Sequence, residues 1–97
     1  MFLEVDLGTE GLSVWTKKTN EYVTFASSGE FERIFGRTRF AVLVVASSET
    51  RLHSLRAHIS KVTSKLFYLS TLARIKSDGF WGPVWFRPEA EQSQSLT

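Results

Sequence analysis

Residues Phe40–Ala46 read Phe-Ala-Val-Leu-Val-Val-Ala and form the longest apolar run of the chain. A short run rich in β-branched residues, without polar residues in alternation, is typical of a strand that is buried on both faces of a parallel sheet. Parallel strands are joined by crossover connections, which are usually helices. The run therefore predicts an α/β fold, with helices in the sequence on either side of it.

A helix is expected directly after this strand. Ser47 or Ser48 can cap its N-terminus, and Glu49 is favourable in the first turn because a helix N-terminus carries positive partial charge. The apolar residues that follow recur at helical spacing. They are Leu52, Leu55, Ile59, Val62 and Leu66.

The neighbouring segments complete a strand–helix–strand–helix–strand order. Phe2–Leu7 is predicted as a strand and Leu12–Ala26 as a helix that Gly29 ends. Because Thr and Val favour strands, a second strand over Glu21–Ala26 stays open as an alternative. Leu66–Leu72 is a third apolar run of strand length. This order predicts right-handed crossovers and a small, mostly parallel sheet flanked by helices.

The remaining segments are expected to be less regular. Glu30–Arg37 is predicted as a short connection that contains one more helical turn. Phe80–Phe86 is predicted as a last extended segment, which Pro83 restricts to an edge of the sheet. Residues 1–88 would then form a single α/β domain, and the polar residues 89–97 a disordered tail.

Composition narrows the class of protein. A chain of 97 residues forms one domain, and the lack of cysteine excludes disulfides, cysteine-ligated zinc and thiol nucleophiles. The first residues have no basic region before an apolar segment, so no signal peptide is predicted. The longest apolar run is too short to cross a bilayer. We therefore expect a cytoplasmic protein with no membrane partner.

Two carboxylates in the first predicted strand are the strongest candidate for chemistry. Glu4 and Asp6 are two residues apart, so their side chains point to the same face of a strand. Such oxygens can hold Mg²⁺ or Mn²⁺, and Lys17 or Lys18 on the following helix can supply a cation for a phosphate. Lys18 is favoured because Tyr22 lies one helical turn further on. This set suggests a metal-dependent phosphodiesterase, with Glu4 and Asp6 as metal ligands and Lys18 as the third catalytic residue. The alternative, and the more common origin of such a pattern, is a pair of surface carboxylates on a half-exposed strand.

The chain resembles a known family at these residues. Phe2–Glu10, Lys18 with Tyr22, and the strand Arg39–Val45 are similar to the replication-relaxation family of bacterial plasmid-associated proteins, as are Arg51–Arg56 and the Gly-Pro-Val-Trp sequence near the C-terminus. That family has a part that resembles the PD-(D/E)XK restriction-endonuclease superfamily. The resemblance implies a truncated restriction-endonuclease-like core, a DNA partner from a plasmid or mobile element, and a metal-binding role for Glu4 and Asp6.

The resemblance also implies an incomplete site. The superfamily places its first acidic residue on a strand that precedes the one equivalent to Phe2–Leu7, and here Met1 stands directly before that strand. We therefore expect a nuclease-related domain with an incomplete metal site, either in a fragment or in a shortened relative.

Basic residues on the helix after the central strand suggest a second function. They can contact phosphates or form an ordinary solvated face, and they are Arg51, Arg56, Lys61 and Lys65. Trp81 and Trp85 can stack on bases, although core packing or a dimer edge is more common for such a pair. The main alternative to a nuclease is therefore a non-enzymatic DNA- or protein-interaction module that forms a homodimer through an exposed sheet edge. An anion site at Gly8–Gly11 is a third alternative.

Overall fold

A computed structural model of the chain describes residues 2–35 and 41–96. Its order is β1 (Phe2–Asp6), α1 (Leu12–Ser27), α2 (Glu30–Phe35), β2 (Val42–Ala46), α3 (Glu49–Ser60), β3 (Phe67–Thr71) and α4 (Leu72–Asp78). Parts of some predicted elements, including Arg37, Arg39 and Phe40, lie outside the described residues. Within the described part, no helix is both long enough and apolar enough to cross a membrane.

The three strands form one parallel sheet in the order β1-β2-β3. The register places Glu4 opposite Val44, and Val44 opposite Leu69. The predicted α/β class and the parallel sheet are confirmed, with β2 in the centre and buried along its whole length. This position explains its sequence, because both faces of a central strand are covered. The restriction-endonuclease-like core stays a prediction.

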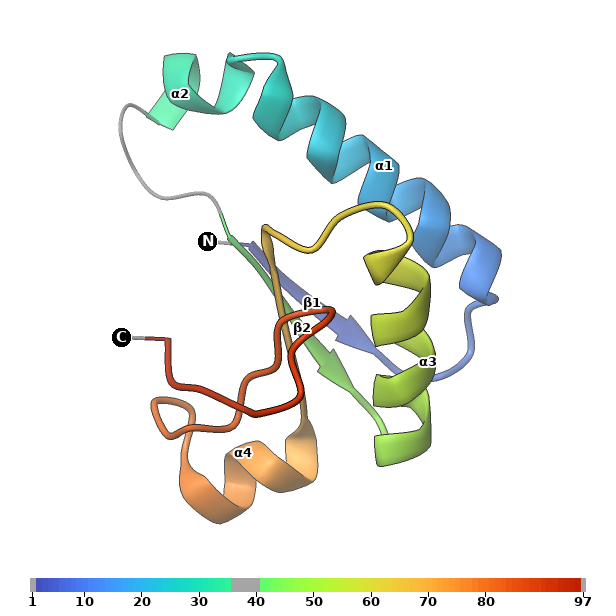
Figure 1. The fold of residues 1–97 in the computed structure, drawn as a ribbon, viewed down its shortest axis with the longest axis vertical. Helices are drawn as coiled ribbons and strands as arrows, with labels where there is room; N and C mark the ends of the chain where they lie inside the picture. The colour runs from blue at the N-terminus through green and yellow to red at the C-terminus, as the bar shows by residue number, and fades with distance from the viewer. Residues whose placement is uncertain (1, 36–40, 97) are drawn as a thin grey trace.

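The two faces of the sheet are covered by different parts of the chain (Figure 1). Val42, Val44 and Ala46 pack with Trp15 of α1 and with the apolar residues of α3. On the opposite face, Leu43 and Val45 pack with residues of the C-terminal segment. Since side chains alternate along a strand, β2 contributes to both clusters. The C-terminal segment therefore takes the place of a further helical layer on the second face.

The helices α1 and α3 follow the predicted periodicity, but the end of α3 differs from the predicted one. Helix α1 covers Glu21–Ala26, so the alternative of a strand there is wrong, and Gly29 follows it with a φ of 81°. Ser48 caps α3 by accepting a hydrogen bond from the Arg51 backbone N–H at 3.1 Å. Helix α3 ends at Ser60, short of the predicted stripe, whose last residue, Leu66, has a positive φ.

Helix α4 was not predicted, because its sequence continues an apolar run of strand length. The Thr71 hydroxyl accepts a hydrogen bond from the Arg74 backbone N–H at 3.2 Å and so caps the new helix. β3 therefore ends at Thr71, one residue before the predicted end, and Leu72 begins α4. A capping hydroxyl inside an apolar run marks this transition.

The C-terminal segment differs from the expected disordered tail. Phe86 forms an antiparallel bridge with Leu69, as expected for a last extended segment at a sheet edge. Trp85 forms a second bridge with Gln94, and Leu96 is buried against the sheet. These residues fold back because the second face of β2 and β3 would otherwise expose apolar side chains to water.

We expect Ile59→Ala to lower the free energy of unfolding by about 2–5 kcal/mol, because Ile59 is fully buried in the cluster between α3 and the sheet. The matched control is Ile34→Ala, at a helical position where the side chain is 55% exposed. The control should change stability by less than about 0.5 kcal/mol. Urea denaturation of both variants measures the difference, and equal losses would contradict the described core.

Candidate functional site

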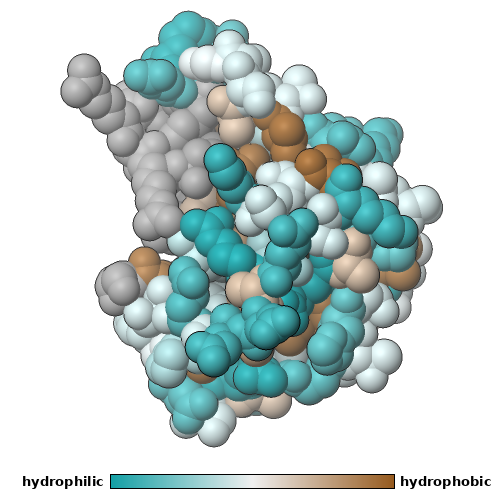
Figure 2. Space-filling view, in the orientation of Figure 1, coloured by the Kyte–Doolittle hydropathy of each residue, from teal (hydrophilic) through white to brown (hydrophobic). Residues whose placement is uncertain are grey.

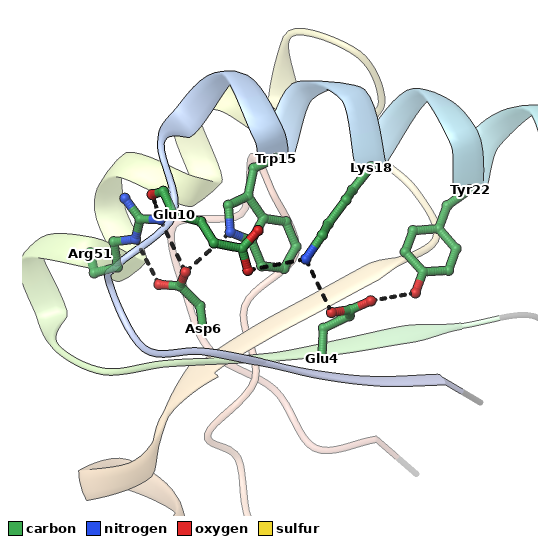
Figure 3. A network of polar contacts seen from close by, with 7 residues as sticks. All are labelled: Glu4, Asp6, Glu10, Trp15, Lys18, Tyr22 and Arg51. Carbon is green, nitrogen blue, oxygen red and sulfur yellow. Dashed lines mark hydrogen bonds and ion pairs between the residues drawn. The ribbon is translucent and has the colours of Figure 1, made fainter.

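The candidate residues lie where β1 passes beneath α1 (Figure 3). Glu4 and Asp6 both point toward α1, because they are two residues apart on one strand. The turn after β1 contains Gly8, whose backbone φ is 78°. Residues other than glycine rarely adopt this conformation. This turn reverses the chain, so that α1 lies above the strand that precedes it.

Asp6 is held by a two-point ion pair. The Arg51 guanidinium donates from Nε to Oδ2 at 2.6 Å and from Nη2 to Oδ1 at 3.0 Å. The indole Nε1 of Trp15 also donates to Oδ1, at 3.1 Å. Asp6 is only 1% exposed, so this carboxylate depends on protein donors for its hydrogen bonds. The contacts join β1, α1 and α3.

The charge on Asp6 is stabilised despite burial. Desolvation alone would raise the pKa of the Asp6 carboxyl, but the hydrogen bonds from Arg51 and Trp15 and the positive charge of Arg51 together lower it. The Arg51 guanidinium donates in addition to the Glu10 carbonyl oxygen at 2.6 Å. Arg51 is therefore the centre of the polar contacts at this end of β1, and its predicted contact with a DNA phosphate stays a prediction.

Glu4 lies in the second half of the same network. Its Oε1 accepts a hydrogen bond from the Tyr22 hydroxyl at 2.7 Å, and its Oε2 is 3.6 Å from Nζ of Lys18. Burial and the hydrogen bond to Glu4 raise the pKa of Tyr22 to about 12, so the hydroxyl stays a donor at neutral pH. Lys18 also pairs with Glu10 at 3.2 Å.

The structure selects Lys18 over Lys17. Nζ of Lys18 lies between the two glutamates and 4.9 Å from the centroid of the Trp15 ring. Lys17 is exposed and has no ion pair with a carboxylate among those found in the described residues. The predicted proximity of Glu4, Asp6 and Lys18 is therefore present, whereas the predicted catalytic and metal roles of these residues stay predictions.

The donor set of this network does not fit a resident metal ion. Both oxygens of Asp6 accept hydrogen bonds from cationic or indole donors, and both oxygens of Glu4 face Tyr22 or Lys18. Residues 2–35 and 41–96 contain no cluster of three or more acidic or histidine side chains arranged to hold a metal. A metal ion would have to displace Arg51 from Asp6 or Lys18 from Glu4.

The predicted DNA-contacting residues do not form one surface. Arg56 donates to the carbonyl oxygens of Arg87 and Ala90, and its guanidinium lies 4.7 Å from the centroid of the Phe86 ring. It therefore fastens the C-terminal segment to α3. Lys61 and Lys65 are exposed, just beyond the end of α3. The two lysines are the exposed members of the predicted set, whereas Arg51 and Arg56 are half-buried. The contact of this set with DNA stays a prediction.

The aromatic residues near the C-terminus also separate. Trp85 is fully buried, and its indole Nε1 donates to the Phe80 carbonyl oxygen at 2.8 Å. Trp81 is 63% exposed. The prediction of a core residue thus holds for Trp85, and a paired stacking platform for bases is not present.

Sequence analysis did not predict that the outer face of β1 is exposed. Leu3, Val5 and Leu7 point away from α1, and their side chains are 61%, 57% and 72% exposed. They line a groove of about 360 Å³ together with residues of β2, α4 and the following segment, among them Val45, Leu72, Ile75 and Phe80. The signal was present in the sequence, because the apolar residues of β1 alternate with the carboxylates that face α1.

This apolar side contrasts with another face of the molecule. The face made by α3 and the C-terminal segment is mainly hydrophilic (Figure 2). Exposed apolar side chains on a β-strand are uncommon in a monomer, especially when they are contiguous. The groove is therefore the second candidate site, beside the polar network.

Comparisons of the chain with protein-family models, with curated proteins and with solved structures gave no match. The resemblance to the replication-relaxation family therefore stays a prediction.

We expect Asp6→Asn to lower the free energy of unfolding at pH 7 by about 3–5 kcal/mol, because it leaves a largely buried guanidinium without its counter-charge. The pKa of Asp6 is lower in the folded state, so the ion pair stabilises the fold fully above the unfolded-state pKa of about 3.9. This stabilisation is lost as the pH falls through the folded-state pKa. Urea denaturation at pH 7 and near pH 3 should show that the difference in free energy of unfolding between wild type and variant is smaller at the lower pH.

The control for this prediction is Glu30→Gln, which breaks the exposed ion pair between Glu30 and Arg33. It should cost less than about 1 kcal/mol at pH 7. A loss in Asp6→Asn no larger than that of the control would show that the buried pair does not hold β1 in place.

Proposed function

We propose that this chain is a non-enzymatic protein-interaction module that binds its partner along the free edge and the outer face of β1. The observation that carries the proposal is the exposure of Leu3 and Val5 on an edge strand of the sheet, and of Leu7 directly after that strand. Burial of these side chains by a partner removes apolar area from water, at about 25 cal/mol for each Å².

The backbone of β1 supports this proposal. The Phe2 backbone N–H donates to the Ala41 carbonyl oxygen at 2.8 Å, so the backbone groups of Phe2 and every second residue after it point toward β2. The N–H and C=O groups of Leu3 and Val5 consequently point to the free edge. A strand edge with such groups can accept a further strand through main-chain hydrogen bonds.

The side chains of β1 do not protect this edge. Natural edge strands commonly carry lysine, proline or an outward charge that prevents pairing with another chain. β1 contains no lysine or proline, and its charged residues, Glu4 and Asp6, point to the inner face, where they are paired with Lys18 and Arg51. The outer face is therefore apolar without interruption.

The polar network supports a structural role in the same module. Its carboxylates and cations are satisfied by one another, and the network connects β1 to α1 and α3. An edge strand that binds a partner must be fixed in position by contacts on its inner face. Movement of the strand would otherwise weaken each main-chain hydrogen bond to the partner. We therefore assign the network to support of the binding edge.

The test is binding of a fluorescently labelled strand peptide with alternating Leu and Thr residues, followed by anisotropy. We expect Val5→Lys to weaken binding by about tenfold or more, because it places a charge within the apolar contact. Val14→Lys is the matched control, since Val14 is also partly exposed but lies on α1. Equal affinities for wild type and Val5→Lys, or no binding of the peptide to the chain at concentrations where it is monomeric, would contradict the proposal.

A second candidate is the DNA-associated, nuclease-related domain of replication-relaxation type. The observation that favours it is the position of Lys18 beside Glu4, on the side of β1 that also carries Asp6. In this candidate Mg²⁺ or Mn²⁺ would bind Glu4 and Asp6 only after it displaced Lys18 from Glu4 or Arg51 from Asp6. The proposed contacts to DNA include the exposed Lys61 and Lys65.

The two candidates differ in a plasmid-cleavage assay with Mg²⁺ or Mn²⁺. We expect no cleavage by the interaction module, because its carboxylates are already paired with cations. Metal-dependent nicking that Glu4→Gln abolishes would favour the nuclease, provided that circular dichroism shows a folded variant. Nicking that persists in Glu4→Gln would point to a contaminating enzyme. Glu30→Gln is the matched control and should leave nicking unchanged, since Glu30 lies on α2 and pairs with Arg33.

A further inference from the structure

We infer that the partner is a second copy of this chain, which adds its own β1 in antiparallel direction and joins two three-stranded sheets into one. This inference rests on the proposed function, because it uses the same edge and outer face of β1. It specifies the partner, the direction of the added strand and the residues that meet.

The size of the apolar surface suits a two-fold dimer. The exposed apolar side chains on this side are Leu3, Val5, Leu7, Leu72 and Trp81. Trp81 is included because its ring centroid is 5.0 Å from that of Phe80, which lines the groove. Together they expose on the order of 500 Å², as a sizeable patch does. Counted on both copies this is roughly 1,000 Å², which is the lower limit for a specific interface.

The edge of β1 is complementary to itself. In a two-fold pair the same residues are used on both copies, and two antiparallel strands satisfy this condition. Pairing centred on Val5 sets Val5 opposite Val5 of the second copy and Leu3 opposite Leu7. Each pair brings apolar side chains together on the outer face, and cross-strand pairs of this kind stabilise a sheet. The outward backbone groups of Leu3 and Val5 then have partners.

The charges of the inner face permit this register. Pairing centred on Val5 sets Glu4 opposite Asp6 of the second copy, which would repel if both were free. Each carboxylate is already paired within its own copy, Glu4 with Lys18 and Asp6 with Arg51.

The first test is sedimentation equilibrium of the full chain over a range of concentrations. We expect the wild type and Val14→Lys to form dimers, and Val5→Lys to raise the dimer dissociation constant by about tenfold or more. A wild type that stays monomeric, or a Val5→Lys variant that dimerises as well as the control, would overturn the inference.

The second test fixes the register by disulfide formation in a chain that has no cysteine of its own. Val5→Cys should cross-link readily on oxidation, because residues at the centre of an antiparallel pair lie at about 5.5 Å between Cα atoms, within disulfide range. Ser64→Cys is the matched control, at an exposed position between α3 and β3. Equal yields for the two variants would overturn the antiparallel arrangement.

The failure of this inference differs from that of the proposed function. A chain that binds the strand peptide but stays monomeric, with equal cross-linking at both cysteines, retains the interaction module and loses the second copy as its partner. A chain that neither binds the peptide nor dimerises loses both.

Discussion

The ion pair between Asp6 and Arg51 connects an edge strand to a helix that begins more than 40 residues later in the chain. β1 has hydrogen-bonded strand partners on one side only, and its outer face contributes exposed side chains instead of core. The strand is therefore positioned mainly by β2 and by the contacts beneath α1. Removal of the Asp6 charge would leave the Arg51 guanidinium without a counter-charge at the point where β1, α1 and α3 meet. The local arrangement therefore depends on this pair.

The network also shows why a pair of carboxylates on a strand is weak evidence for a metal site. Two acidic residues at alternate positions can bind a cation from solution or a cation from the protein, and the sequence pattern is the same in both cases. Here the Arg51 guanidinium forms an ion pair with the Asp6 carboxylate, and the Lys18 ammonium forms one with the Glu4 carboxylate. The chemistry of the pair is decided by what lies opposite it, which is a property of the tertiary structure.

The inner and outer faces of β1 have opposite characters for one reason. Strands usually turn their apolar side toward the core, but β1 turns polar residues toward α1 and apolar residues outward. The inward carboxylates are stable because Trp15, Lys18, Tyr22 and Arg51 donate to them or pair with them. The outward apolar residues lack a comparable cover within the described part of the chain. A partner strand would provide that cover. β1 therefore carries the polar network on its inner face and the proposed interface on its outer face.

The sequence by itself determined the parallel α/β class, the buried central strand and the side of α3 that packs on the sheet. A continuous β-branched run and apolar residues at helical spacing indicate these features through local geometry alone. The sequence also determined that Glu4 and Asp6 point to the same side of β1, since spacing along a strand sets direction, whereas the tertiary structure decided that Lys18 and not Lys17 lies beside Glu4. Only the tertiary structure decided that Arg51 and Arg56 bind carboxylate or carbonyl oxygens within the fold, because their partners are distant in sequence. It likewise decided that Leu96 packs against the sheet and that Leu3, Val5 and Leu7 face outward, because burial depends on which segments pack on each face.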